Sequence, residues 1–356
     1  MIRHTPKCVF LMLVFAFASA PLGTAREQKI ASDQPIPARV ATIQSKDATV
    51  KSTLEALTKQ SGLEVDISEI DGSKPIKAAF DKAEFWKVVD AVAEQSGSRV
   101  AIGQLGKSVR LMPNTNGAKP VISVDGPFRI VAREIDVRRD LITGSTVYDL
   151  TLEIAWEARL PVFRMDGTPT IVKGEDDNGR PITAKSIASR VAVDGVSALA
   201  KVRLEGITRD SKQIAILQGS YRITAAEEML RCQFDDLTKL PAAFKQSGVN
   251  VDLKRFAKSG SYWNADIELN YPSGGPIFES FETYWLSRNR IALISPAGKK
   301  IATSDEEIDG SSLRYRFKES PDFKPADLKG WKLEYETTGV MREVTVKFEL
   351  KGIPLP

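Results

Sequence analysis

The first folded segment that the sequence predicts contains two helices, each followed by a strand. Two sets of apolar residues recur at three- and four-residue intervals, which predicts one buried face on each helix. The sets are Val50, Leu54 and Leu57, then Phe85, Val88, Val89 and Val92. Each leads to the tripeptide Gln-Ser-Gly, in which Gly62 and Gly97 are typical helix ends. Alternation over 63–67 and 100–102 predicts the strands, so the region is a repeat of two helix–strand units.

Further motifs in this region indicate a family. The segment enters its first helix through Asp47-Ala48, continues with Leu54-Glu-Ala-Leu57, and has a second helix of the same length with the same Gln-Ser-Gly stop. In these features residues 41–113 resemble the short N-terminal domain of secretins and TonB-dependent transducers. The resemblance implies a small periplasmic α+β domain that contacts partner proteins and carries out no chemistry. No secretin or transducer barrel follows it in this sequence.

The rest of the chain is patterned as strands. A segment rich in proline and glycine, 113–127, marks a domain boundary. Beyond it, short runs of alternating apolar and polar residues recur, as at 150–156 and 265–271. These two runs align without a gap together with Pro-Val-Phe at 161–163 and Pro-Ile-Phe at 276–278. The shared order of strands predicts a duplicated domain.

Each copy contains about seven such runs, which is typical of an antiparallel β-sandwich of the immunoglobulin or fibronectin type. The predicted copies are residues 120–238 and 245–356, and near their ends Gln233-Phe234 aligns with Lys347-Phe348. The expected fold class is therefore mainly β, with a small α+β domain at the N-terminus followed by two duplicated antiparallel β-sandwiches.

The N-terminal residues predict a signal peptide. Arg3 and Lys7 precede an apolar run at 9–20 that is too short to span a bilayer comfortably, and small residues follow. We expect cleavage after Ala25, a polar linker over 26–40, and a mature chain without a transmembrane segment. The predicted localisation is periplasmic or secreted.

Composition excludes several kinds of chemistry. The only histidine is His4, inside the predicted signal peptide, so the mature chain has no imidazole general base and no histidine-ligated zinc. Removal of Cys8 leaves Cys232 alone, without a disulfide. The counterpart of Cys232 in the second copy is Val346, which lies in an alternating run, so we expect Cys232 at a buried core position. The 50 basic residues nearly balance the 46 acidic ones, with no concentrated basic face, so nucleic acid is not an expected partner.

A Gly-Lys-Ser at 106–108 looks like the end of a phosphate-binding loop. That loop requires a glycine five residues before Gly106, where this chain has Ala101. The residues from Val109 onward alternate like a strand rather than a helix. We interpret the segment as the turn of a hairpin that closes the first domain.

Candidate ligand-binding residues lie in an aromatic stretch of the second copy. Phe281, Tyr284 and Trp285 could form a stacking platform for sugar rings, or they could fill the core or a domain interface. The first alternative predicts a carbohydrate-binding module.

Paired carboxylates offer another alternative, a glycoside hydrolase that works without histidine. The candidate groups are Glu279 with Glu282, Asp176 with Asp177, and the acidic run 305–309. All are local in sequence, so solvated surface is the simpler interpretation, and calcium binding at the second or third group stays open.

These patterns predict an exported, non-enzymatic protein of the cell envelope that acts through protein–protein or surface binding. We assign no catalytic residue, cofactor or metal site from the sequence. An envelope protein is the expected partner, carbohydrate is the alternative ligand, and sheet edges and inter-domain grooves are the expected contact surfaces.

Overall fold

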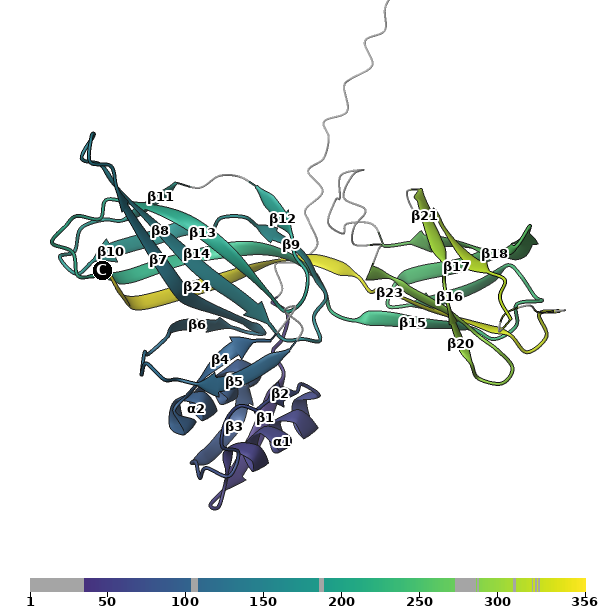
Figure 1. The fold of residues 1–356 in the computed structure, drawn as a ribbon, viewed down its shortest axis with the longest axis horizontal. Coiled ribbons are helices and arrows are strands. Elements are labelled where there is room, and N and C mark those ends of the chain that lie inside the picture. Colours follow the sequence, from purple (N-terminus) through teal and green to yellow (C-terminus); the bar gives the residue numbers. More distant parts are fainter. Residues whose placement is uncertain are drawn as a thin grey trace, which may run out of the picture.

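The structure is a computed structural model that describes residues 35–103, 108–185, 189–272, 286, 288–309, 312–321, 323, 325 and 327–356. Strands predominate over helices, so the predicted mainly-β fold class is confirmed. Figure 1 shows three parts: a small α+β part and two β-sandwich-like parts joined by long strands. In the part of the chain described, no helix is both long and apolar enough to cross a membrane.

The N-terminal part contains both predicted helices. Its elements are β1 (Val40–Ser45), α1 (Val50–Ser61), β2 (Val65–Asp66), β3 (Ala78–Glu84), α2 (Phe85–Ser96), β4 (Ser98–Ile102) and β5 (Val109–Pro113). Helix α1 starts at a capping box in which Thr49 and Ser52 bond each other's backbone N–H. Both helices end at the predicted glycines, Gly62 and Gly97, whose φ angles of 74° and 71° favour glycine. The apolar faces that the spacing predicted are buried in one core.

Two small sheets complete this part. Strand β1 pairs with β3, while the second sheet has the order β2-β5-β4. Strands β4 and β5 form the predicted hairpin, in which Val100 lies opposite Leu111 and Ile102 opposite Val109.

The first sandwich-like part consists of two sheets that share one core. One sheet has the order β11-β13-β8-β7-β6, and the other contains β10, β14, β9 and β12, with β24 paired along β14. The bounds are β6 (Val121–Asp125), β7 (Phe128–Arg139), β8 (Thr146–Trp156), β9 (Val162–Asp166), β10 (Thr170–Asp176), β11 (Thr183–Lys185), β12 (Arg190–Ala192), β13 (Ser197–Glu205), β14 (Gln213–Ala226) and β24 (Met341–Pro354).

The second sandwich-like part has sheets of order β16-β17-β18-β22-β21 and β15-β23-β19-β20 around a second core. The bounds are β15 (Met229–Phe234), β16 (Ala242–Gln246), β17 (Val249–Ser259), β18 (Tyr262–Asn270), β19 (Arg290–Ile294), β20 (Lys300–Ala302), β21 (Asp305–Asp309), β22 (Ser312–Lys318) and β23 (Lys332–Thr338). The order of its larger sheet along the chain repeats that of β6-β7-β8-β13-β11. The two runs that aligned in the sequence lie in β8 and β18, the middle strand of each sheet.

The last strand of each expected copy, 120–238 and 245–356, does not pair within that copy. Strand β15 follows β14 directly in the chain but pairs with β23, and β24 follows β23 but pairs with β14. The last strand of each expected copy therefore lies in a sheet of the other copy. Alternation along a strand shows which side chains are buried and does not show which partner strand lies beside it, so the sequence pattern could not reveal this exchange.

The exchanged strands form one continuous antiparallel ribbon through both sandwich-like parts, visible in Figure 1 as the long strands that join them. Pairing runs from Gln213↔Pro354 to Ala226↔Met341 and resumes in the same register at Met229↔Thr338. At the joint, the N–H of Gly339 donates to the carbonyl of Glu228 at 2.9 Å. Two hydrogen-bonded strands, rather than a single linker, thus join the two parts.

Candidate binding groove

A groove with a volume of about 810 Å³ lies between the N-terminal part and the first sandwich. Helix α2 fixes the two parts together on one side of it. The Trp86 indole N–H donates to the carbonyl of Pro127 at 2.9 Å, and the Arg129 guanidinium binds both carboxylate oxygens of Asp90. These groups are largely buried, so the walls of the groove are held by a packed interface rather than by a flexible linker.

The register of β7 and β8 determines which residues form the floor. Arg129 lies opposite Ala155, and Ala155 is buried in the core of the N-terminal part. Side chains on one face of a sheet recur every second residue, so Val131 and Glu153 continue that face beyond the interface. Leu199 of β13 lies opposite Glu153 on the same face and remains 56% exposed. The groove therefore has aliphatic side chains on an open sheet face.

Two sheet edges flank the groove. Strand β4 is the end strand of its sheet and pairs with β5 alone among the described strands. Strand β7 pairs with β6 from Phe128 to Ala132, and its pairing with β8 has a bulge directly after Ala132. Beyond the bulge, in the part of the chain described, residues 134–139 of β7 pair with β8 alone. The outward backbone groups of these edges are available for pairing with another extended chain.

The charges at the groove are of two kinds. Arg133 is paired with Glu153, and Arg129 with Asp90. Arg99 and Lys119 are exposed and have no acidic partner within the described ranges. Both also line a neighbouring cavity of about 600 Å³. The groove therefore offers two cations to a ligand that carries negative charge.

Gly103, which precedes the Gly-Lys-Ser segment in the chain, lines this groove. Residues 104–107 fall outside the described residues. On either side of them, the N–H of Gly103 donates to the carbonyl of Ser108 at 2.7 Å, and a strand begins at Val109. The predicted hairpin is confirmed, and no helix follows the motif as a phosphate-binding loop requires.

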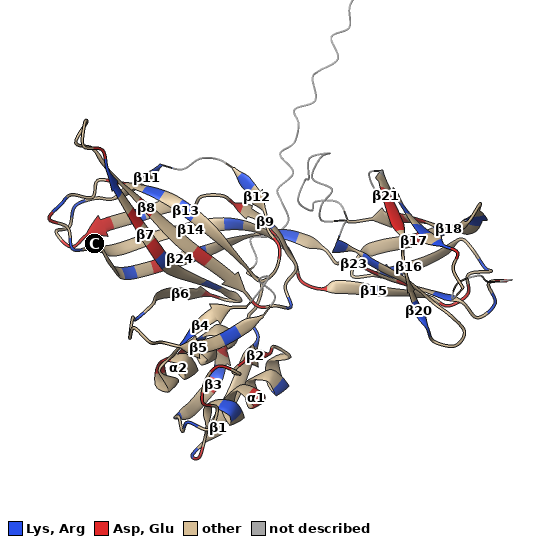
Figure 2. Cartoon of the chain, viewed as in Figure 1, with Lys and Arg blue, Asp and Glu red and all other residues tan. Residues whose placement is uncertain are grey.

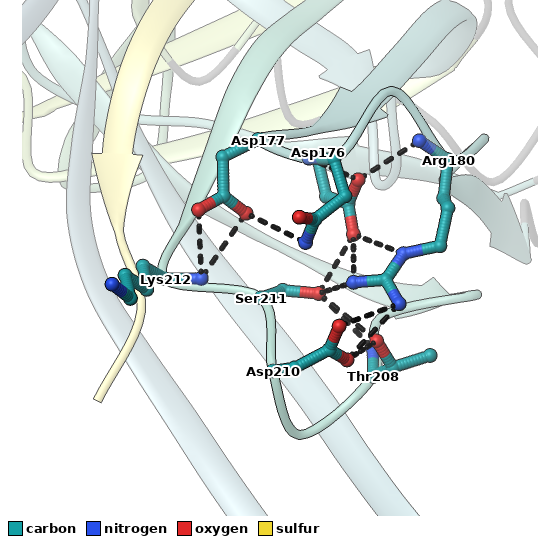
Figure 3. A network of polar contacts seen from close by, with 8 residues as sticks. Asp176, Asp177, Arg180, Thr208, Asp210, Ser211 and Lys212 are labelled. Atoms are coloured by element: carbon teal, nitrogen blue, oxygen red, sulfur yellow. Dashed lines mark hydrogen bonds and ion pairs between the residues drawn. The ribbon is translucent and has the colours of Figure 1, made fainter.

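The acidic candidates at Asp176 and Asp177 belong to a compact network, shown in Figure 3. The Asp176 carboxylate accepts hydrogen bonds from the N–H groups of Asn178 and Arg180, the Arg180 guanidinium and the Ser211 hydroxyl, at 2.7 to 2.9 Å. Burial raises the pKa of this carboxyl, but the four donors outweigh it and hold the pKa well below its usual value. The network ties the turn after β10 to the loop before β14.

The network is explained as a structural clamp. The oxygens of Asp176 already accept protein donors, and Asp177 accepts the N–H of Lys212. Within the described ranges, no group of three His, Cys, Asp or Glu residues is arranged to hold a metal ion. The acidic run of β21 is likewise paired, because Asp305 and Glu307 both bind Arg316 on β22.

Of the remaining residues singled out in the sequence, the structure describes Cys232 but not the aromatic and acidic residues between 279 and 285. Phe281, Tyr284, Trp285, Glu279 and Glu282 lie outside the described residues. Cys232 is 1% exposed, and burial raises the pKa of its thiol to about 12, so its predicted core position is confirmed.

Sequence reasoning missed the residues that define the groove. Arg99 lies on a short strand and Lys119 in the joint after β5, and neither position has a local pattern that indicates a site. Outside the groove, the sequence does contain an unusual feature, the apolar pair Leu141-Ile142 within a turn that carries a glycine.

Comparison with protein-family models, with curated proteins and with solved structures found no match to this chain.

Proposed function

We propose that this chain is an exported, non-enzymatic protein of the cell envelope that binds an extended segment of a partner protein in the groove between its N-terminal part and first sandwich. The observation that carries the proposal is the pair of open sheet edges, β4 and β7, that line a groove with an exposed aliphatic floor. An added strand would gain backbone hydrogen bonds from one edge and apolar contacts from Leu199 and Val131.

The charges define the partner segment further. Arg99 and Lys119 have no acidic partner in the described part of the chain, so acidic residues in the bound segment would complete them. We therefore propose an extended segment in which aliphatic and acidic residues alternate.

The secondary structure of the N-terminal part supports the resemblance to the short N-terminal domain of secretins and TonB-dependent transducers. Two helices of equal span, each ended by glycine, recur in the order that the resemblance implies. Domains of that family contact partner proteins, which agrees with a binding role. Export rests on the predicted signal peptide, and the absence of enzymatic activity rests on the composition of the mature chain.

Site-specific crosslinking in the cell envelope tests this function. A photoreactive phenylalanine in place of Leu199 is expected to crosslink to one protein, and the reversal Arg99→Glu with Lys119→Glu is expected to abolish that product. The same photoreactive residue in place of Val172, an exposed residue on β10, is the matched control. A crosslinking pattern at position 199 that equals the pattern at 172 contradicts the proposal.

Hydrogen exchange with the crosslinked partner then tests strand addition. Amides in the range 134–139 or in β4 should exchange more slowly when the partner is present. Unchanged exchange along both edges would show that the partner binds without adding a strand.

A further inference from the structure

The hairpin that joins β7 to β8 projects from the body of the first sandwich (Figure 1) and ends in two exposed aliphatic residues. Leu141 is 88% exposed and Ile142 is 97% exposed, the highest values among the large hydrophobic residues described. Single exposed aliphatic residues are common on protein surfaces, but an adjacent pair at the end of a projecting hairpin exposes both to whatever the hairpin meets first.

The turn is built so that these side chains stay outside. The Asp140 carboxylate accepts the backbone N–H groups of Ile142 and Thr143 at 2.8 and 3.0 Å, and these bonds lower the pKa of that carboxyl. The N–H of Gly144 donates to the Asp140 carbonyl at 2.9 Å, with the glycine at a φ of 71°. The backbone of the tip is therefore organised by hydrogen bonds, and neither aliphatic side chain folds back onto the sandwich.

The stem below the tip carries positive charge. Arg139 is exposed and has no acidic partner in the described residues. Arg138 binds Asp149, but that single carboxylate also binds Arg203 of β13, so one acidic group serves two guanidinium groups. The Asp140 carboxylate is turned back toward the N–H groups of the turn. The hairpin thus combines an apolar tip with a stem whose arginines are only partly neutralised.

The shape of the tip decides between a protein pocket and a lipid surface. A specific protein interface usually buries about 800 Å² on each partner, which requires a broad contact area around a central anchor. A projecting hairpin offers little area around its two aliphatic residues. A bilayer needs only an apolar tip that reaches the acyl boundary and basic groups at headgroup level. We propose that Leu141 and Ile142 insert into the surface of an anionic bilayer, with Arg138 and Arg139 at the headgroups.

The expected binding is weak and reversible. Even a single myristoyl chain gives only marginal membrane binding, and two aliphatic side chains bury less apolar surface than such a chain. Binding through the hairpin does not depend on the groove. Failure of one proposal leaves the other intact.

Vesicle sedimentation tests the proposal directly. The protein is purified after export, with loss of residues 1–25 checked by mass spectrometry, and mixed with vesicles of phosphatidylglycerol and phosphatidylcholine in equal parts. The double variant Leu141→Ser with Ile142→Ser should bind roughly 10-fold more weakly or worse. Arg139→Gln should bind about 5-fold more weakly to these vesicles and unchanged to phosphatidylcholine alone, because one basic residue near an anionic surface contributes about 1 kcal/mol. Val172→Ser is the matched control, since it removes an exposed aliphatic residue from another strand.

A labelled variant locates the contact. Cys232 is buried, so Ile142→Cys adds one accessible thiol for an environment-sensitive dye, and Val172→Cys provides the control. Dye emission should shift to the blue with vesicles at position 142 and not at position 172. The proposal is overturned if the protein does not sediment with anionic vesicles, or if the double serine variant sediments as well as the original. It is also overturned if the variant abolishes a dimer that forms without lipid, because the tip then contacts a second copy of the chain.

Discussion

Asp176 illustrates how a carboxylate that resembles a site can be fully used by the fold. Its side chain is buried, and its oxygens hold two backbone N–H groups, a serine and an arginine that also binds Asp210. A charged group taken out of water is retained when donors replace its hydration, and here they do. Figure 2 shows that acidic and basic residues are interspersed over the other strands as well.

The Asp176 network predicts a measurable acid sensitivity. Asp176→Asn should lower the midpoint of thermal unfolding by several degrees at neutral pH, because Arg180 and Ser211 lose their shared acceptor. The pKa of Asp176 in the folded state lies below the ordinary aspartate value of 3.8, so the stabilising contribution of this carboxylate is present above that pH. The contribution is lost as the pH falls below 3.8 toward the folded-state pKa.

Thermal melts of the original chain and the variant from neutral to acid pH check this. The gap between the two midpoints should narrow as the medium becomes acidic. Asp177→Asn, which changes the neighbouring carboxylate with its fewer bonds, is the control and should shift the midpoint less. Curves that stay parallel down to the acid limit would show that Asp176 is not the titrating group.

At the scale of single elements, local patterns predicted what depends on local spacing. Helices α1 and α2 follow from the three- and four-residue intervals of their apolar residues, and their glycine ends follow from a backbone conformation that few other residues adopt. Strand β24 shows the limit. Its alternating apolar residues would be buried against either sandwich, and its partner depends on contacts more than 100 residues away in the chain. The groove was missed for the same reason, since β4, β7 and β13 meet only in the folded protein.

Gly219 in β14 is a position where close packing of the neighbouring strands leaves no room for a side chain. A Cβ atom there would lie 2.6 Å from the Thr170 carbonyl of β10 and 2.7 Å from the Phe348 ring of β24. Gly219→Ala should therefore destabilise the first sandwich by about 1–3 kcal/mol, the usual range for overpacking. Chemical denaturation measures this, with Ser220→Ala as the neighbouring control. A loss of stability no larger than that of the control would show that β10 and β24 can move apart at no cost.

At the scale of the whole molecule, the ribbon of β14–β15 and β23–β24 makes the two sandwich-like parts interdependent. Each part contains the last strand of the other part's expected sequence range. Arg288, from the second part, adds a contact by donating to the carbonyl of Val162 at 2.6 Å and lying over the Phe163 ring at 4.9 Å. A domain boundary placed at 238–245 therefore separates β15 from β23, the strand with which it pairs, and does not fall in a linker between two domains.

A fragment that keeps β24 beside β14 should fold, and a fragment that lacks β24 should not. Residues 120–238 contain β15 without its partner and lack β24, whose Val346, Phe348 and Leu350 lie in the first core, so this fragment should not fold. Residues 120–226 joined by a short glycine–serine linker to 341–356 restore β24 beside β14 and should fold into the first sandwich. Amide dispersion in NMR spectra distinguishes the two.

The control is the range 229–338, which keeps β15 with β23 and should fold alone as the second sandwich, because its core draws no residue from β14 or β24. If 120–238 folded as well as the joined fragment, β15 would be able to turn back onto β14, and the exchange would be one of two arrangements open to the chain. Slow exchange between these arrangements would then allow two copies of the chain to swap strands. The hinges would be residues 227–228, which join β14 to β15, and residues 339–340, which join β23 to β24. Failure of 120–238 together with folding of the other two fragments means that the first sandwich forms only after the second has been synthesised and β24 has followed it.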